Sequence, residues 1–549
     1  MTKKKKELIV TSALPYANGP LHFGHLLEHI QTDIWVRSQR ILGNKVIYLC
    51  ASDAHGTPIM MKAEEEKTSP EELVSKYMIE HKNTLKNFQV LHDCYYQTHS
   101  EENRKYSELI YNRAFENGYI QKKNIKQLFD EEKKLFLADR YVRGTCPKCN
   151  AENQYGDNCD ACGAKYEATD LINPVSVFSE KTPIIKESEH LFFSLTKLEE
   201  EIKTWIDKSS LHENVINKLQ EWFKDGLMDW DISRDAPYFG FKIPGFEDKF
   251  FYVWLDAPIG YIGTLEKYLE EIGSKDTAET LWGEDSNFEI YHFIGKDILN
   301  FHALFWPALL HAANFKKPSN VFVHGFLTLN GNKMSKSKGN FLLADQYTEI
   351  LESDFLRYYL ASKLTNKIDD IDLNLDDLQK KVNTDLVGKF INIASRVQKF
   401  LKIKGNKLGN NLEDELVDKC ISEAKDIYED FKDLNYSNAC KRIMKLADMA
   451  NQYVDHNEPW VLAKENVNEK EVIKIASTAL NLFRILNICL EPIIPNTAFK
   501  IKEYLNIPKD SLENIEIKLT NHEIREFKPL MMRIEDEKIK FLKEASTNG

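Results

Sequence analysis

Two histidines, His22 and His25, stand three positions apart just after an Asn-Gly-Pro turn at 18–20. A short apolar segment, 8–10, precedes the turn, and the residues after His25 have the apolar spacing of a helix. The pair is therefore predicted at a helix N-terminus, where backbone N–H groups and the helix dipole favour anions. Imidazoles at such a place indicate a phosphate ligand. The alternative is that both histidines cap the helix or are buried for structural reasons.

A second candidate for phosphate chemistry is the segment NGNKMSKSKGN at residues 330–340. Lys333, Lys336 and Lys338 alternate there with small residues, in a loop that is predicted to follow a strand. Such a loop can close on a triphosphate and stabilise the charge that develops in the transition state. A lysine-rich loop alone indicates little, because most are solvated surface. Together with the histidine turn it indicates a nucleotide site.

Four cysteines form two closely spaced pairs, Cys146-x2-Cys149 and Cys159-x2-Cys162. This spacing is typical of a tetrahedral zinc knuckle, in which each pair turns both thiolates toward one ion. A disulfide framework is disfavoured in the cytosol, and a redox pair would not need a second copy. Because thiolates fill all four ligand positions, the predicted site is closed and structural rather than catalytic.

The elements that must position these residues alternate between strands and helices in the first part of the chain. Strands are expected at 8–10, at 46–50 and within 288–297 and 320–331, which predicts an α/β fold with a Rossmann-like, doubly wound parallel sheet. Ligands bind such sheets at the carboxyl ends of the strands. From about residue 375 a helical stripe and similar patterns predict an α-helical bundle; the stripe consists of Leu386, Phe390, Ile393, Val397 and Phe400.

Composition narrows the class of protein. The 549 residues are enough for several domains, and the net charge of −12 argues against a globally basic nucleic-acid coat, although not against local basic patches. No apolar run reaches the roughly 18 residues of a membrane span, and no signal peptide follows the basic start. A soluble cytoplasmic protein without membrane contact is expected.

Several phrases resemble a known family. HFGH at 22–25 resembles the first signature of class I aminoacyl-tRNA synthetases, usually HIGH, and KMSKS at 333–337 matches the second letter for letter. ALPYANG, DAHGTPI, FYVWLDAPIGY, HFIGKD and EPWVLAK resemble the methionyl-tRNA synthetase family in particular, over nearly the whole chain, and the cysteines resemble its single-zinc form common in bacteria. Phe23 replaces the usual aliphatic residue. The chain stops at Gly549 without the C-terminal dimerising and tRNA-binding module of many relatives, so a monomer is expected.

The resemblance implies a methionine–tRNA ligase. Such an enzyme activates L-methionine with ATP to methionyl-adenylate and pyrophosphate, and then transfers methionyl to the 3′-terminal adenosine of initiator and elongator tRNA(Met). Mg²⁺ is expected with ATP, and one structural Zn²⁺ is expected on the cysteines. The resemblance gives catalysis to His22, His25, Lys333 and Lys336, and ATP binding to His22, Gly24, His25, Gly295, Asp297, Leu327 and Lys336.

Two further sites follow from the same resemblance. The methionine pocket is expected to contain Ala13, Leu14, Tyr16, Asp53, Trp254, Ala257, Pro258, Tyr261, Ile298 and His302, with Asp53 pairing with the substrate ammonium. Core packing is the alternative for Trp254 and Tyr261, and an ordinary turn carboxylate is the alternative for Asp53. Anticodon recognition is assigned to Asn392, Arg396 and Trp460, unless Trp460 anchors the bundle and Arg396 is a surface salt-bridge partner.

The predicted domains follow the order of the motifs. They are the first catalytic half (1–117), a connective insertion with the zinc knuckle (118–235), the second catalytic half (236–325), a KMSKS-loop stem-contact region (326–374), a helical anticodon-binding domain (375–525) and a C-terminal helical tail (526–549).

Three other functions share part of this pattern but conflict with the rest of the sequence. A synthetase for leucine, isoleucine or valine would carry a far larger editing insertion. A small-molecule nucleotidyltransferase would have no use for the helical domain or for KMSKS. A zinc-ribbon nucleic-acid-binding protein without catalysis conflicts with the net acidity and the two phosphate loops.

Overall fold

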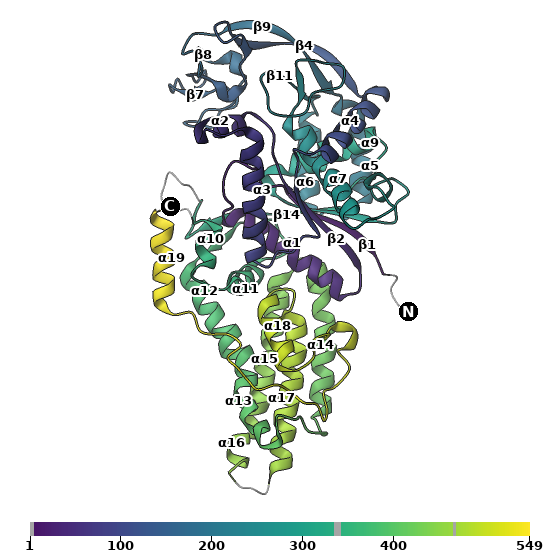
Figure 1. Cartoon of the computed structure of the whole chain (residues 1–549), viewed down its shortest axis with the longest axis vertical. Helices are drawn as coiled ribbons and strands as arrows, with labels where there is room; N and C mark the ends of the chain where they lie inside the picture. Colours follow the sequence, from purple (N-terminus) through teal and green to yellow (C-terminus); the bar gives the residue numbers. More distant parts are fainter. Residues whose placement is uncertain (1–4, 334–341, 465–467, 549) are drawn as a thin grey trace.

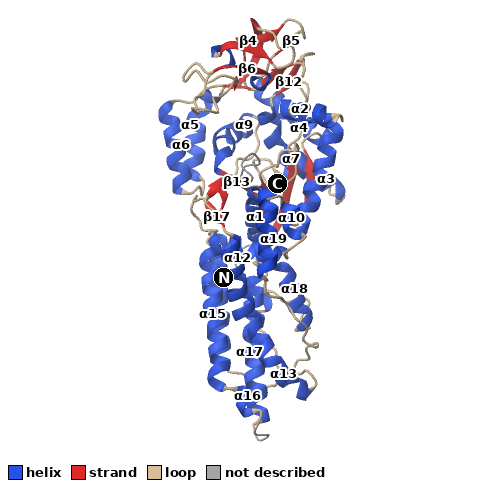
Figure 2. Ribbon diagram, turned by 90° about the vertical axis from the view of Figure 1, so that its left-hand side faces the viewer, coloured by secondary structure: helices blue, strands red, loops and turns tan. Residues whose placement is uncertain are grey.

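The computed structural model describes residues 5–333, 342–464 and 468–548. The molecule is elongated, with a strand-rich part at one end, an α/β layer in the middle and a helical bundle at the other end (Figure 1). The view turned by 90° shows the same three parts stacked along the long axis (Figure 2). The α/β fold and the helical C-terminal part that the sequence predicts are confirmed.

The central sheet has five parallel strands in the order β14-β13-β1-β2-β3. The strand order reverses at β1, between β13 and β2, and in doubly wound sheets this switch point is where ligands bind. The strands are β1 (Glu7–Ser12), β2 (Lys45–Ser52), β3 (Cys94–Gln97), β13 (Glu289–Gly295) and β14 (Asn320–His324).

Both faces of this sheet are covered, which is why its strands are apolar on both sides. On one face Leu8 and Val10 of β1 share a core with α1, and on the other face Ile9 shares a core with α7 and α4. The helices around the sheet are α1 (Phe23–Ile41), α2 (Thr57–Glu66), α3 (Pro70–Asn87), α4 (Glu101–Glu116), α7 (Val253–Glu271), α8 (Ala278–Leu281) and α9 (Trp306–Ala312), the last preceded by a π-helical turn, Phe301–Phe305.

The insertion between α4 and α7 is built on a long antiparallel pair. In that pair β4 runs beside β9 from Ile120 opposite Phe193 to Phe129 opposite Ile184. A small sheet in the order β7-β6-β8 carries the cysteine segment. The elements are β4 (Ile120–Asp130), β5 (Leu135–Phe136), β6 (Val142–Thr145), β7 (Gln154–Tyr155), β8 (Ile172–Ser176), β9 (Ile184–Phe193), α5 (Glu199–Lys208), α6 (Glu213–Asp225), β10 (Trp230–Asp231), β11 (Ser233–Asp235) and β12 (Lys249–Phe251).

The segment NVFVHGFLTLNG, which the sequence suggests is one strand, is divided between two sheets. After β14 the chain leaves the parallel sheet at Gly325, where an added Cβ would lie 2.2 Å from the carbonyl oxygen of Asp369, so only glycine permits this close approach. It then enters a small sheet in the order β16-β15-β17. These strands are β15 (Leu327–Leu329), β16 (Asn332–Lys333) and β17 (Ile371–Leu373).

The helical part begins with α10 and α11 and continues as a bundle in which α15 and α17 pack together. The predicted stripe from Leu386 to Phe400 is buried, although its first half is π-helical (Val382–Ile391). The helices are α10 (Ala344–Thr348), α11 (Ser353–Lys363), α12 (Leu375–Lys381), α13 (Asn392–Leu401), α14 (Asp414–Lys432), α15 (Tyr436–Asn457), α16 (Pro459–Leu462), α17 (Glu469–Leu490), α18 (Pro495–Tyr504) and α19 (Asp536–Asn548).

One fully buried guanidinium joins the two halves of the molecule. Arg357 of α11 donates to Asp33 of α1 at 2.7 Å, to the carbonyls of Pro492 and Ile493 beyond α17, and to Phe88 after α3. Burial disfavours the charged Asp33, but the neighbouring Arg37 and Arg357 outweigh that cost and lower the pKa of Asp33. The catalytic and helical parts are therefore packed as one unit at this contact.

Within the described ranges one helix, α17, is long and apolar enough to cross a membrane by composition. Of its apolar window, 94% is buried inside the molecule. Its hydrophobicity is thus that of a core helix.

Candidate active site

A cavity of about 910 Å³ lies at the carboxyl ends of β1, β2 and β13, at the switch point of the sheet. The strand ends, the N-terminus of α1 and the first turns of α7 all contribute side chains to it. Every described residue that was predicted to bind methionine or ATP lines this cavity: Ala13, Leu14, Tyr16, His22, Gly24, His25, Asp53, Trp254, Ala257, Pro258, Tyr261, Gly295, Asp297, Ile298, His302 and Leu327.

The two histidines form a reciprocal cap at the start of α1. His22 is the N-cap residue, and its Nδ1 accepts the Gly24 N–H at 3.0 Å; the His22 N–H donates to Nδ1 of His25 at 3.2 Å. The two rings stack with centroids 3.9 Å apart. Helix capping, which the sequence left open as the alternative to phosphate binding, is thus present, and both rings line the cavity as well.

This cap fixes the protons of the two rings. Burial, together with His22 and His81, holds the pKa of His25 well below its ordinary value, so the ring is neutral at pH 7. Since Nδ1 of His25 accepts an amide proton, its own ring proton lies on Nε2, and a neutral His22 is held in the same tautomer. Each imidazole therefore offers an Nε2–H donor, which suits phosphate oxygens.

Asp53, directly after β2, is half-buried, and its carboxylate is only partly compensated. Its Oδ1 has no hydrogen-bond partner among the described residues. Burial and the nearby Asp256 raise the pKa of Asp53 well above its ordinary value. A buried anion of this kind is costly unless a cation pairs with it, so the geometry favours a cationic ligand group at this end of the cavity.

Next to Asp53 the cavity wall is aromatic and held by directed hydrogen bonds. The Tyr261 O–H donates to Nε2 of His302 at 2.9 Å, because Nδ1 of His302 donates to the carbonyl of Ile298 at 3.1 Å. Burial lowers the pKa of His302 to about 4, which keeps this ring neutral. Trp254 stacks on Phe301 with centroids 3.6 Å apart. Tyr261 thus packs into the core, whereas Trp254 is half-buried against Phe301. Together these side chains form a rigid, largely apolar wall suited to a thioether.

At the other side of the switch point, Asp297 follows β13. A Cβ on Gly295 would lie 2.5 Å from Oδ1 of Asp297, so glycine leaves room for this carboxylate to turn back over the strand end. Leu327 of β15 lines the same part of the cavity. Lys333 pairs through its backbone with Thr328 of β15, and the remaining predicted lysine, Lys336, lies outside the described residues.

The sequence reasoning missed several lining residues. Glu28 is buried in the cavity wall 3.4 Å from His324, and its spacing of three from His25 on one helix face could have revealed it. The segment between α4 and α7 contributes Asp139, Arg140, Arg234 and Tyr238, for which the sequence carries no periodic or motif signal, and Tyr252, which lies in the motif FYVWLDAPIGY two positions before the predicted Trp254.

The four cysteines come together in the insertion. Their sulfur atoms all lie within 4.8 Å of one another, with Cys146 3.9 Å from Cys162 and Cys149 3.5 Å from Cys159. Backbone N–H groups of Lys148 and Cys162 donate to two of the sulfurs at 3.4 Å. This group can hold a metal ion.

The residues predicted for the anticodon lie at the far end of the bundle. Arg396 of α13 pairs with Asp455 and lies 5.0 Å from the centre of the Trp460 ring. Both side chains line a hollow of about 360 Å³ together with Ser395 and Lys399. Asn392 donates to Asn451 of α15 at 3.2 Å. Both structural alternatives are partly realised, since Trp460 is half-buried against the bundle and Arg396 has a salt-bridge partner.

Comparison with known proteins agrees with this geometry. Residues 8–398 match the family described as tRNA synthetases class I (M), and residues 404–544 match the anticodon binding domain of methionyl tRNA ligase. The Mycobacterium tuberculosis methionyl-tRNA synthetase in complex with methionyl-adenylate is 23% identical with a TM-score of 0.79, over 96% of this chain and 99% of that chain. The apo form of the same enzyme is 21% identical with a TM-score of 0.73, over 97% and 99% of the two chains.

The fold, with a histidine-capped helix at its cavity, is that of a class I aminoacyl-tRNA synthetase. The two family matches together cover nearly all of the chain. The chain belongs to the methionyl-tRNA synthetase family. It is a ligase that activates methionine and charges tRNA with it.

Proposed function

We propose that the cavity at the switch point joins methionine to ATP. The methionine carboxylate attacks the α-phosphate, pyrophosphate leaves, and the methionyl group then passes to the 3′-terminal adenosine of initiator and elongator tRNA(Met). The observation that carries this proposal is the chemistry of the groups that line a single cavity. Asp53, with one carboxylate oxygen that has no hydrogen-bond partner among the described residues, and the imidazoles of His22 and His25 line the same cavity.

Asp53 binds the substrate ammonium in this scheme and thereby orients the carboxylate toward ATP. The positive charge of the ammonium compensates the negative charge of the Asp53 carboxylate. The thioether then lies against the wall formed by Trp254, Tyr261 and His302, with Ala13, Leu14, Tyr16, Ala257, Pro258 and Ile298 completing the pocket. The fixed Tyr261–His302 pair supports this assignment, because it leaves no free donor that would favour a polar side chain over sulfur.

His22 and His25 donate to phosphate oxygens, and Gly24 lets the phosphate approach the helix N-terminus. Asp297 accepts from ribose hydroxyls beside Gly295, and the backbone at Leu327 faces adenine. Lys333 and Lys336 stabilise the departing pyrophosphate, for which the support is the KMSKS motif. Catalysis is then mainly positioning and stabilisation of developing charge, and ATP enters as its Mg²⁺ complex.

We also propose that Cys146, Cys149, Cys159 and Cys162 hold one zinc ion. A tetrahedron with Zn–S bonds of about 2.3 Å has edges of about 3.8 Å, and the observed sulfur separations of 3.5 and 3.9 Å fit that size. Four thiolates leave no open position, so the ion stabilises the insertion and takes no part in the chemistry.

At the far end of the bundle, Arg396 and Trp460 stack on anticodon bases while Asn392 bonds to a base edge. The hollow that Arg396 and Trp460 line, with Lys399 beside them, supports this assignment. We further propose that the chain works as a monomer in the cytoplasm, which light scattering and cell fractionation test.

Methionine-dependent exchange of labelled pyrophosphate into ATP tests the proposed chemistry, and charging of purified initiator and elongator tRNA tests the second step. Exchange supported by leucine, isoleucine or valine instead of methionine would contradict the assignment of the pocket.

A further inference from the structure

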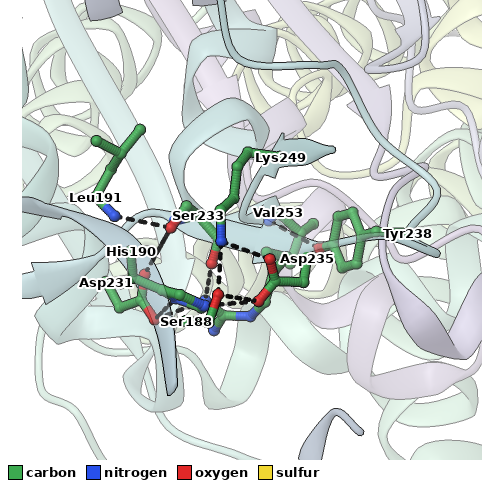
Figure 3. Close-up of polar contacts among 10 residues, drawn as sticks. Ser188, His190, Leu191, Asp231, Ser233, Asp235, Tyr238, Lys249 and Val253 are labelled. Atoms are coloured by element: carbon green, nitrogen blue, oxygen red, sulfur yellow. Dashed lines mark hydrogen bonds and ion pairs between the residues drawn. The ribbon is translucent and has the colours of Figure 1, made fainter. Parts of the chain in front are cut away.

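The hairpin β11–β12 is the place where the insertion reaches the cavity. Arg234 of β11 and Tyr238, in the turn between the two strands, both line the cavity wall. Next to Arg234 lies a cluster of charged side chains from four elements, β9, β10, β11 and β12 (Figure 3). His190 of β9 is at its centre.

Both ring nitrogens of His190 are bonded to carboxylates. Nδ1 lies 2.6 Å from Oδ2 of Asp231, and Nε2 lies 3.0 Å from Oδ2 of Asp235, while the side chain is 0% exposed (Figure 3). An ionised carboxylate can only accept, so both ring nitrogens must carry protons and His190 is an imidazolium. Burial opposes this charge, but the two carboxylates outweigh it and raise the pKa of His190.

The two carboxylates are themselves held in place. Asp235 accepts from Lys249 of β12 at 2.5 Å and from Ser188 at 2.8 Å. Asp231 accepts from the Ser233 backbone N–H at 3.1 Å and from its hydroxyl at 3.2 Å, and the Leu191 N–H donates to that hydroxyl oxygen at 2.9 Å. The opposite strand β4 places Lys123 in register with His190, and Lys123 is paired with Asp229. His190 therefore joins β9 to Asp231 of β10 and to Asp235 of β11.

In the sequence, Arg234 lies between Asp231 and Asp235, the two aspartates that are bonded to His190. Its guanidinium donates to the carbonyl of Ser233 at 2.6 Å, lies 3.5 Å from Asp231 and stacks 3.7 Å from the centre of the Tyr252 ring. Tyr238 accepts the N–H of Val253 at 3.1 Å, at the start of the helix that carries Trp254. The position of the cavity wall on this side thus depends on where the hairpin is fixed.

We propose that His190 is a positioning residue for methionine activation: as an imidazolium it fixes Asp231 and Asp235, and so holds the hairpin that presents Arg234 and Tyr238 to the cavity. Loss of its proton leaves two facing carboxylates with one fewer cation, and the hairpin shifts. This clamp, which consists of the protonated His190 with Asp231 and Asp235, is complete below the pKa of His190 and is lost as the pH rises through that pKa. This inference rests on the proposed role of the cavity in joining methionine to ATP.

The test compares pH profiles of methionine-dependent pyrophosphate exchange for the parent, His190→Gln and Asp231→Asn. Gln keeps a hydrogen-bond donor but cannot carry the proton. We expect kcat/KM at neutral pH to fall roughly 10- to 100-fold in His190→Gln, the usual effect of misplaced cavity groups. Its pH profile should also lack the fall in kcat/KM at alkaline pH, the alkaline limb, that the parent owes to loss of the His190 proton. Asp231→Asn keeps an acceptor but removes one charge, so it should move that limb to lower pH.

Nuclear magnetic resonance gives the pKa of His190 directly, because the imidazole signal that is missing in His190→Gln belongs to this residue. The limb in the parent should coincide with that pKa. The ammonium of methionine titrates equally with all variants, so it cannot cause a difference between them. His456→Gln, an exposed histidine in the helical part, is the matched control and should follow the parent.

A folded His190→Gln with the parent's rate and profile would overturn the proposal. So would a limb that Asp231→Asn leaves in place, which would reduce His190 to a structural role. If His190→Gln does not fold, Asp231→Asn, which keeps the imidazole, decides the question. Failure of the proposed function is distinguishable, because the parent itself would then show no exchange with methionine.

Discussion

At the scale of single residues, His22 and His25 cap a helix and are proposed to bind phosphate, and these two roles differ in chemistry. In each ring Nδ1 accepts a backbone N–H of the helix cap, which places the ring proton on Nε2. A histidine that only capped the helix could be replaced by glutamine, which is favoured at the third helical position for the same bond. A histidine that also donates to phosphate could not.

We therefore predict that His25→Ala and His25→Gln both lose roughly 10²- to 10³-fold in methionyl-adenylate formation, the usual cost of removing one preorganised donor. Methionine affinity, measured by equilibrium binding, should be nearly unchanged, because His25 faces the phosphate end. Full activity in His25→Gln would mean that the residue only caps the helix, and an equal loss of methionine affinity would also contradict the assignment.

Asp53 is expected to act through charge. Asp53→Asn should weaken methionine binding about 100-fold or more, since removing one partner of a buried ion pair costs about 3–5 kcal/mol. An analogue of methionine without the amino group should bind the variant at least as well as it binds the parent. Equal losses for methionine and for this analogue would show that Asp53 does not meet the ammonium.

The same carboxyl predicts a pH dependence. Burial and Asp256 raise the pKa of Asp53 in the free protein, so part of the population is protonated at pH values where an exposed aspartate is ionised. The affinity for methionine should rise as the pH rises through this raised pKa and then level off. Calorimetric titration of the parent checks this, and Asp53→Asn should lack the rise.

At the scale of elements, the insertion combines a small local core with a loop whose four cysteines can hold a metal ion. Beneath the cysteines the core is small, with Leu128, Leu137, Tyr141, Val142 and Leu171 as its buried members. A bound ion would contribute folding free energy directly.

Cys159→Ser should therefore remove the single zinc expected from metal analysis and make segment 139–176 exchange its amide hydrogens faster. Cys94→Ser, which changes a cysteine outside the cluster, is the control and should keep the metal. Parent protein that contains no zinc, or whose four thiols react freely without a chelator, would contradict the prediction.

The elements also show how far the sequence could predict the fold. The helix start at His22 follows from turn chemistry and apolar spacing, and the parallel sheet follows from short buried strands. The division of the strand at Gly325 could not be predicted, because it depends on the carbonyl of Asp369, which lies in a distant segment. The contribution of Arg234 to the cavity depends on a turn clamped by His190 of another strand. Such contacts between distant segments leave no local pattern.

At the scale of the whole molecule, the cavity and the hollow at Trp460 lie in different parts of an elongated structure joined near Arg357. Chemistry at one end and tRNA binding at the other can therefore be separated by mutation.

Trp460→Ala should leave methionine-dependent pyrophosphate exchange nearly intact and weaken tRNA binding by about 1–3 kcal/mol, the value of one stacked base, or roughly tenfold or more. Filter binding and aminoacylation measure the two effects. Phe499→Ala, an exposed aromatic of α18 outside the hollow, is the control. An unfolded variant, or one that charges tRNA as well as the parent, would contradict the anticodon role.

The central claim, that one cavity joins methionine to ATP, is tested most directly by pyrophosphate exchange into ATP with each amino acid supplied alone. We predict that methionine supports exchange in the absence of tRNA and that leucine, isoleucine and valine do not at the same concentration. In Asp53→Asn the methionine concentration needed for exchange should rise about 100-fold or more. Absence of exchange with methionine, or an equal signal from another amino acid, would contradict the account.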